Sequence, residues 1–445
     1  MKANAMRNTD QINRQFFKYV SQNILGMIGI SLYILADTFF ISQAVGADGI
    51  TALNLVLPVY AVIFAIGAMI GGGSSIRFSI ARSSAGAERD SWFMNALFWG
   101  TAAGLVFTVI GLSAPAKLVA MLGGDAEIVA VGSGYTRIFM TCAPFFIWNQ
   151  ICNAFVRNDG APSVAMAATL SGSIFNIVLD YVLMFPAGMG MNGAALATAL
   201  SPLVGVSVCC IHFAGKDNTI SFRPVLPSVT RLLHACSVGV AAFVGEISSG
   251  VITMVFNFLI LHLTGNVGVA AYGVVANVSL VVMAIFNGVA NGTQPLMSEC
   301  YGQSMAGSGM QAAGKLKKLR NMSIGTAILL ALLVIAVIWV AAESIAGIFD
   351  REHDEELLGY AAEGLRLYFT GFLFAGVNIV GTSMFSALDR AKWAFAASIL
   401  RGFVAIIPCA VALSAAFGMK GVWLAFPAAE FITLIITVAG LLKIV

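Results

Sequence analysis

Long uncharged stretches constrain this sequence more than any other feature. Residues 160–179 and 181–215 contain no Asp, Glu, Lys or Arg, and the single carboxylate of Asp180 separates them. About 20 helical residues cross the ~30 Å hydrocarbon core of a bilayer, so runs of this length predict membrane-spanning helices. Only 10% of the chain is charged, against about a quarter in a soluble domain. Barrel strands alternate with period two and these runs do not, which leaves helices as the spanning structure.

Twelve such runs are predicted as spans, which makes the chain an all-α polytopic membrane protein. The first six are 16–42, 50–79, 93–116, 135–156, 163–186 and 191–214. The second six are 232–263, 267–298, 322–348, 358–385, 393–416 and 421–439. With an even number of spans, both termini lie on the same side of the membrane.

Basic residues gather on one side of this predicted topology. Eighteen of the 24 Lys and Arg residues fall near the termini or in loops on that side, and the acidic loop 350–356 falls on the other. By the positive-inside rule, both termini are predicted to be cytoplasmic. We expect the protein in the cytoplasmic (inner) membrane of a prokaryote.

Short segments recur in the two halves of the chain. GADGITAL, from Gly46, matches GNVGVAAY, from Gly265, and GMNGAALATAL, from Gly190, matches GMKGVWLAFPA, from Gly418. Six spans per half give both halves the same orientation. The predicted fold is therefore two six-helix lobes related by a pseudo-two-fold axis along the membrane normal. The predicted domains are an N-lobe of residues 1–215, a cytoplasmic lobe linker of 216–231 and a C-lobe of 232–445.

Four carboxylates fall inside predicted spans, where a charge costs at least ~2.5–3.5 kcal/mol and therefore indicates a function. They are Asp37, Asp180, Glu246 and Glu430. Asp37 and Asp180 lie a few residues before the outer ends of their spans, and Thr198 lies a few residues after the outer start of its own. At 1.5 Å per residue, all three are about 8–11 Å from the outer boundary. Asn176, one helical turn before Asp180, shares its face.

This set of oxygens suits a small hard cation, or a proton shared between two acids. We therefore predict a Na⁺ or H⁺ coupling site formed by Asp37, Asn176, Asp180 and Thr198. The equivalent positions in the second half are all apolar, which indicates that the shared scaffold does not need the polar groups. Those positions are Phe256, Val404, Pro408 and Phe426.

The other intramembrane carboxylates differ in their neighbours. Glu430 and Arg401 lie at similar depths, about 12–14 Å from the inner ends of adjacent spans, and are predicted to form an ion pair. Glu246 has no charged neighbour within its span and is an additional coupling or substrate candidate. The fourth span carries a polar and aromatic group that is predicted to face a bound ligand: Trp148, Asn149, Gln150 and Asn153.

Several segments carry a family resemblance. They are DTFFISQAVGADGITALNLVLPV from Asp37, MIGGGSS at 69–75, NDGAPSVA at 158–165 and NIVLD at 176–180. With them, the whole chain resembles the multidrug and toxic compound extrusion (MATE) transporters of the DinF-like branch that includes the MepA type. The order and spacing of Asp37, Asn176, Asp180 and Thr198 match the N-lobe cation site of that branch, and Glu246 resembles the acidic residue of span seven in several MATE branches.

The resemblance implies a secondary active antiporter, not an enzyme. It would export cationic or lipophilic compounds in exchange for inward H⁺ or Na⁺, by rocker-switch alternating access. Two features depart from the family pattern. The body of span ten has no acidic residue, where other branches pair one with span seven, and span one lacks the proline on which a bending mechanism in some relatives depends.

An alternative from the same superfamily is a lipid-linked oligosaccharide flippase. Such a protein needs several cationic side chains in its cavity to bind a pyrophosphate. In this sequence Arg401 is the one Lys or Arg deep enough within a predicted span to serve. A membrane enzyme would show clustered nucleophiles or metal ligands, and a channel a ring of like charges; neither pattern is visible.

The expected ligands are limited to small cationic or lipophilic drugs, membrane lipids and the coupling cation. The seven cysteines show no CxxC or metal-ligand spacing, so we expect no cofactor and no disulfide framework. We expect no nucleic-acid partner and a monomeric protein.

Overall fold

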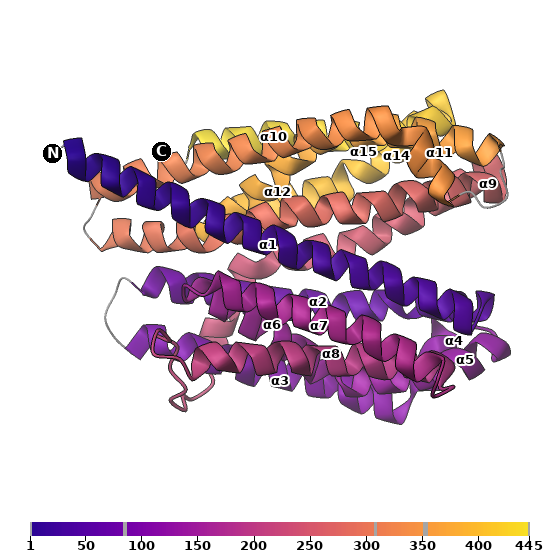
Figure 1. Ribbon diagram of the computed structural model, residues 1–445, viewed down its shortest axis with the longest axis horizontal. Helices are drawn as coiled ribbons and strands as arrows, with labels where there is room; N and C mark the ends of the chain where they lie inside the picture. Colours follow the sequence, from indigo (N-terminus) through magenta and orange to yellow (C-terminus); the bar gives the residue numbers. More distant parts are fainter. Residues whose placement is uncertain (1, 83–86, 307–308, 350–354, 444–445) are drawn as a thin grey trace.

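The uncharged runs form long helices in the computed structural model, which describes residues 2–82, 87–306, 309–349 and 355–443. A bilayer offers no water to backbone groups, and a helix pairs them internally. The helices of the first half are α1 (Lys2–Ala44), α2 (Ala47–Ala81), α3 (Ala87–Ser113), α4 (Pro115–Met121), α5 (Ala126–Thr141), α6 (Ala143–Asn158), α7 (Pro162–Met184) and α8 (Gly190–Phe213). The second half has α9 (Val229–Met305), α10 (Gly309–Phe349), α11 (Glu355–Phe369), α12 (Phe372–Ala387), α13 (Ala391–Ile399), the π-helix η1 (Leu400–Val404), α14 (Ile406–Phe417) and α15 (Met419–Leu442). Figure 1 shows the long helices running along one axis.

The twelve predicted spans are present, although not as twelve unbroken helices. In the described residues, nine helices are long and apolar enough to cross a membrane, and α11 with α12 forms a tenth, bent span. Helix α9 counts once among these but crosses twice, because Gly265 leaves the helical conformation and the chain turns back there (Figure 1). The fourth predicted span consists of α5 and α6, which meet at Cys142.

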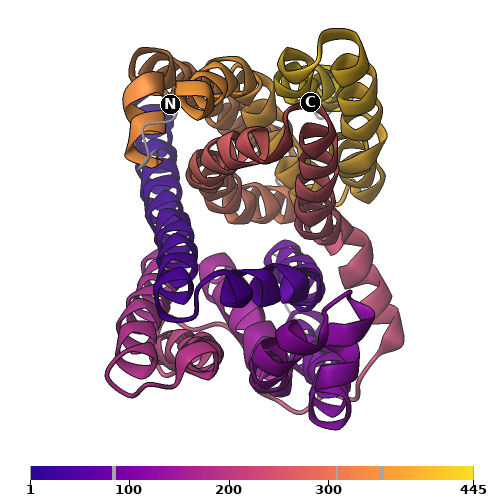
Figure 2. The same cartoon turned by 90° about the vertical axis from the view of Figure 1, so that its right-hand side faces the viewer.

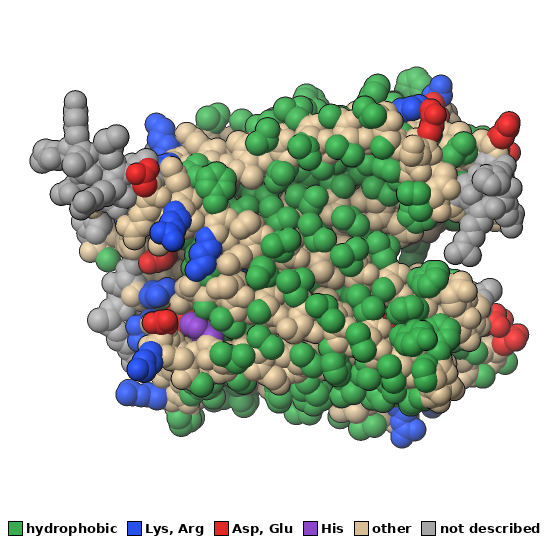
Figure 3. Space-filling view, viewed as in Figure 1, with side chains coloured by type: hydrophobic (Ala, Val, Ile, Leu, Met, Phe, Trp, Pro, Cys, Tyr) green, Lys and Arg blue, Asp and Glu red, His purple; other side chains and the backbone are tan. Residues whose placement is uncertain are grey.

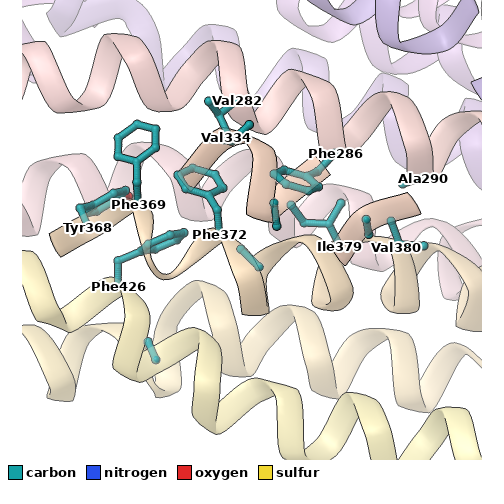
Figure 4. Close-up of a cluster of buried hydrophobic side chains, with 14 of the residues drawn as sticks. Val282, Phe286, Ala290, Val334, Tyr368, Phe369, Phe372, Ile379, Val380 and Phe426 are labelled. Atoms are coloured by element: carbon teal, nitrogen blue, oxygen red, sulfur yellow. The ribbon is translucent and has the colours of Figure 1, made fainter. Parts of the chain in front are cut away.

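Two of the spans are broken where the sequence predicted a continuous helix. The break at Cys142 comes just before Pro144, which lacks a backbone donor and lies in the first turn of α6. Helices α11 and α12 are bent by 48°. At this bend a β-carbon on Gly371 would lie 2.6 Å from the ring of Phe426. Figure 4 shows that ring beside Tyr368, on which it stacks at 4.3 Å between centroids.

The internal repeat extends well beyond the short sequence matches. Gly46 and Gly265 share a conformation that favours glycine, with φ of 80° and 66° and ψ of −152° in both. Gly190 and Gly418 both have positive φ, at 52° and 58°. The offset of 228 residues between this second pair also carries the bounds of α5, α6 and α8 to within one residue of those of α11, α12 and α15. The predicted fold of two similar six-span halves is confirmed.

Two buried hydrophobic clusters follow the two halves of the chain. One extends from Ile41 to Ala235, and the other lies mostly between Ala241 and Leu441. The second cluster also contains Phe16 of α1, so the beginning of α1 lies against the second half. Figure 2 shows α1, in indigo, running along one side of the molecule from one group of helices to the other. The lobe bounds given above stay a prediction, since α1 contacts both halves.

The two halves approach most closely where α2 crosses the beginning of α9. A β-carbon on Gly73 would overlap the carbonyl oxygen of Ala235, and one on Gly239 would overlap that of Met69. Small residues let membrane helices approach in this way. The contact lies toward the end of the molecule at which Lys and Arg gather, whereas Figure 3 shows a notch between the halves at the opposite end. Of the acidic loop 350–356, residues 350–354 lie outside the described residues.

Polar contacts also join the two halves at this basic end. Arg77 Nη2 lies 2.8 Å from Asp389 Oδ1. Asn158 donates to Gln294 at 3.3 Å, and Gln294 donates to Asn158 at 3.1 Å. Both amides are buried. Because buried amides need partners, their reciprocal pairing fixes how the two halves meet.

A larger side chain at the α2–α9 contact should force the halves apart. We predict that Gly239→Val destabilises the protein by about 1–3 kcal/mol, the usual cost of overpacking, and widens its basic end. Spin labels at positions 216 and 392, in a background without the native cysteines, would report the distance across that end. Gly245→Val on the same helix is the control, because a β-carbon there meets no atom within 4 Å. Equal changes in the two variants would contradict the prediction.

Candidate functional site

The four residues of the predicted coupling site lie together in the first half. Asp37 comes from α1, Asn176 and Asp180 from α7, and Thr198 from α8. All four are buried, with Asn176 and Asp180 at 0% exposure. Their similar depth in three neighbouring helices is what brings them together, while their role in coupling stays a prediction.

Asn176 connects Asp180 to the neighbouring helix α8. Its Nδ2 lies 3.3 Å from Thr198 Oγ1. With the amide turned so that both of its atoms meet complementary groups, the nitrogen donates to Asp180 Oδ2 at 3.2 Å and the oxygen accepts from the backbone N–H of Thr198 at 3.3 Å. A change of charge on Asp180 therefore alters the hydrogen bonds that link it, through Asn176, to α8.

The carboxyl groups of Asp37 and Asp180 lie close enough together for a hydrogen bond between them. An ionised carboxylate has no proton to donate, so this bond needs a proton between the two acids. Each acid also keeps a buried Oδ1 for which the described part of the chain supplies no hydrogen-bond partner. Among the described residues, no Lys or Arg forms an ion pair with either acid. The arrangement is one that a proton or a small hard cation can occupy.

Tyrosines beside the two acids were missed from the sequence. Tyr33 precedes Asp37 by one helical turn, and its hydroxyl lies 3.2 Å from that of Tyr60 on α2. Tyr60 stacks on Phe139 at 4.9 Å between centroids, and Tyr135 is within electrostatic range of both acids. The spacing of Tyr33 and Asp37 was a usable signal. Tyr60 and Tyr135 become neighbours only through the packing of α2 and α5.

Glu246 lies on α9, in the other half, and its side chain is exposed. Glu246 is close enough to Tyr33 of α1 to act on it electrostatically, so it lies near the helix that carries Asp37. In the part of the chain that the structure describes, it forms no ion pair. Intramembrane carboxylates face the bundle interior or a water-filled cavity, which assigns this side chain to the space between the halves.

The four residues predicted to face the drug point toward four different helices. Trp148 donates to Thr101 of α3 at 2.8 Å. Asn149 lies against Gly205 of α8, and Gln150 against Gly67 of α2. Asn153 accepts a hydrogen bond from Thr169 of α7 at 3.4 Å. The fold thus does not bring these side chains to one face, and their contact with a drug stays a prediction.

The predicted pair of Glu430 and Arg401 is present in the second half. Arg401 donates to Glu430 Oε1 from Nε at 3.0 Å and from Nη2 at 2.7 Å. Asn378 of α12, which the sequence did not indicate, donates to Glu430 Oε2 at 2.7 Å and to its backbone oxygen at 2.8 Å. Glu430 is 3% exposed. Every charge in this cluster has a partner inside the protein, in contrast to the acids of the first half.

Arg401 reaches Glu430 from a π-helix, η1, within the eleventh span. Single π-helical turns are rare in proteins overall, but many of those that occur are at functional sites. The next residue, Gly402, lies against α9, where a β-carbon would be 2.6 Å from that of Ser248. The altered helix therefore directs the guanidinium toward α15 while its backbone stays close to α9.

A further charged cluster lies at the basic end, where no role was predicted for histidine. Asp159 is buried and lies 2.8 Å from His212 Nε2. It also accepts hydrogen bonds from the backbone N–H of Thr219, at 2.8 Å, and from the Thr219 hydroxyl. Thr219 belongs to the segment that joins the two halves. Asp159 therefore anchors that segment to the first half of the protein.

Removing the guanidinium from the second half should leave a buried, unpaired carboxylate. We predict that Arg401→Met destabilises the protein by about 3–5 kcal/mol, and that adding Glu430→Gln restores part of the loss. Thermal unfolding in detergent would measure both. Arg366→Met is the control, because its partner Glu343 is 69% exposed and such pairs contribute about 0–1 kcal/mol. A loss no greater than that of the control would contradict the prediction.

Twelve spans in two similar halves, with buried acids in one half and an exposed carboxylate facing it, are the features of a membrane transporter. The MatE family model matches residues 23–182 and 241–411, and the chain belongs to that family of multidrug export transporters rather than to any class of enzyme.

Named relatives and solved structures agree with this family. The multidrug export protein MepA of Staphylococcus saprophyticus is 28% identical over 404 residues, which cover 90% of this chain and 86% of that protein. An outward-facing multidrug resistance MATE transporter of the MOP superfamily has a TM-score of 0.89 at 23% identity, over 97% of this chain and 96% of the other. A MOP superfamily transporter from Pyrococcus furiosus has a TM-score of 0.88 at the same identity and coverage.

Proposed function

We propose that the protein is a secondary active antiporter that exports cationic and lipophilic drugs in exchange for inward H⁺ or Na⁺. The observation that carries this proposal is the contact between Asp37 and Asp180, two buried acids to which no Lys or Arg of the described residues is bound. Two adjacent carboxylates cannot both stay ionised in a low-dielectric environment. A cation from outside the protein is the partner that this site lacks.

Cation binding would act on three helices at once. A proton or Na⁺ at Asp37 and Asp180 removes the repulsion between α1 and α7, and Asn176 passes the change to α8. Coupling requires the cation to bind the two conformations with different affinity. A site built from side chains of separate helices supports such a difference, since its geometry changes when the helices move.

Drug binding is assigned to the space between the halves. Glu246 offers an exposed carboxylate there, across from Tyr33, Tyr60 and their aromatic neighbours. A carboxylate and aromatic rings are the groups that attract an organic cation. Cation binding beside Tyr33 would alter the same wall of the cavity and thereby weaken the hold on the drug.

Alternating access would follow from rocking of the two halves about their contact. The basic end is closed by Gly73 and Gly239, and the opposite end carries the notch (Figure 3). By the positive-inside rule we assign the basic end, with both termini, to the cytoplasm. With the closed end in the cytoplasm, the notch opens outward, which supports the proposal of an outward-facing state of a monomer in the inner membrane.

The flippase alternative is disfavoured by the placement of Arg401. A pyrophosphate needs several accessible cations, and this guanidinium already makes two hydrogen bonds to Glu430. Glu246 adds a negative charge to the space that such a substrate would have to enter.

Transport driven by an imposed gradient tests the coupling site. A proton gradient and a sodium gradient would be imposed separately on proteoliposomes. We expect one of the two to drive export of a cationic dye by the wild type. Asp180→Asn should lower that transport about tenfold or more, since each ~1.4 kcal/mol of cation-binding free energy is a factor of ten.

The matched control is Asp90→Asn, which removes a carboxylate at the basic end that is paired with Arg89. It should transport like wild type. If Asp180→Asn also transports like wild type under the driving gradient, Asp180 is structural and the proposed coupling site is wrong.

A further inference from the structure

A groove opens on the outside of the second half, near its basic end. It lies between α13 and α15 and has a volume of about 400 Å³. Its walls are Lys392, Trp393, Ala396, Ile435, Ile436 and Ala439. Neither the carboxyl pair nor the space between the halves includes any of these residues, so the groove is separate from the transport site.

The two ends of the groove differ in chemistry. Lys392 is exposed at its mouth, and Lys443 Nζ lies 5.1 Å from the centroid of the Trp393 ring. In the described residues neither lysine forms an ion pair. Farther from the mouth the lining is aliphatic, and Ile435 is 61% exposed. A groove with a positively charged mouth and an apolar lining is complementary to a molecule with an anionic head and a hydrocarbon tail.

Trp393 is held in place as the wall between these two regions. A β-carbon on Gly440 of α15 would lie 2.8 Å from Trp393 Cε3 and 2.5 Å from Phe385 Cζ, so glycine is needed for the indole to lie against α15. The rings of Trp393 and Phe385 have centroids 6.1 Å apart. A fixed tryptophan beside lysines is typical of the headgroup level of a membrane. Arg320 of α10 adds a third cation nearby, donating to the backbone oxygen of Leu441 at 3.4 Å.

We propose that this groove binds an anionic phospholipid. Its phosphate lies between Lys392 and Lys443, its glycerol region lies beside Trp393, and one acyl chain follows Ile435 and Ala439 along α15. Basic pockets between membrane helices on the cytoplasmic side attract such lipids. The charge complementarity selects an anionic lipid over a zwitterionic one.

Retention of lipid by the purified full-length protein tests the proposal. Native mass spectrometry would compare phosphatidylglycerol with phosphatidylcholine of the same acyl chains. Wild type should retain phosphatidylglycerol preferentially, and Lys392→Gln with Lys443→Gln should weaken that preference about tenfold, as expected when two charges near a headgroup are removed. Lys117→Gln with Lys420→Gln, at the opposite end, removes the same charge and should leave the preference unchanged. Equal losses in the two pairs, or none in the first, would overturn the proposal.

A second variant separates the lipid from a simple anion. Ala439→Trp keeps both lysines but fills the apolar part of the groove, and it should lower phosphatidylglycerol retention to a similar extent. A thermal unfolding transition in phosphatidylcholine at the temperature of the wild type would show that the variant is folded. If Ala439→Trp retains the lipid like wild type, or if inorganic phosphate alone displaces it, the groove does not hold an acyl chain and the proposal is wrong.

Discussion

The backbone contact between α2 and α9 at Gly73 and Gly239 sets the relation of the two halves. No side chain separates the helices there, so the basic end is closed as tightly as two backbones allow. Long rigid helices that meet at one end and cross at an angle must separate toward the other. Glu246 lies seven residues beyond Gly239, about 10 Å farther along α9 at 1.5 Å per residue. The contact thus places this carboxylate in the open part of the molecule, across from Tyr33.

The two halves share one scaffold but treat a buried acid in opposite ways. In the second half, Glu430 has its cation built in, because Arg401 and Asn378 use both of its carboxylate oxygens. In the first half, Asp37 and Asp180 contact each other, and each keeps a buried oxygen that no described residue pairs. A membrane gradient acts only on a cation that can leave, and Arg401 cannot. The asymmetry of the two sites therefore follows from which half contains its own guanidinium.

Much of the fold and part of the candidate site could be predicted because membrane burial simplifies the sequence. Uncharged runs marked the spans. Similar depth within the membrane then predicted that Asp37 lies near Asp180 and that Arg401 pairs with Glu430. The pairing of Asn378 with Glu430 could not be predicted, because mid-span amides are common and only tertiary packing selects their partners. The π-helix around Arg401 has no sequence signature, and the break at Gly371 depends on the distant ring of Phe426. The segment of Trp148 and Asn153 had the composition of a binding stripe, but these side chains contact different neighbouring helices, which only the tertiary packing determines.

Adjacent residues at the end of α6 connect the closed end to the candidate site. Asn158 bonds to Gln294 of the other half, and Asp159 holds the segment that joins the halves. Gly160, with φ of 96°, then turns the chain into α7, the helix that carries Asp180. A hydrogen bond contributes only about 0.5–1.5 kcal/mol net, so each of these contacts alone adds little to the stability of the closed end, as the proposed rocking of the two halves requires. Because α7 begins within a few residues of those bonds, a movement that breaks them also moves the helix on which the buried acid lies.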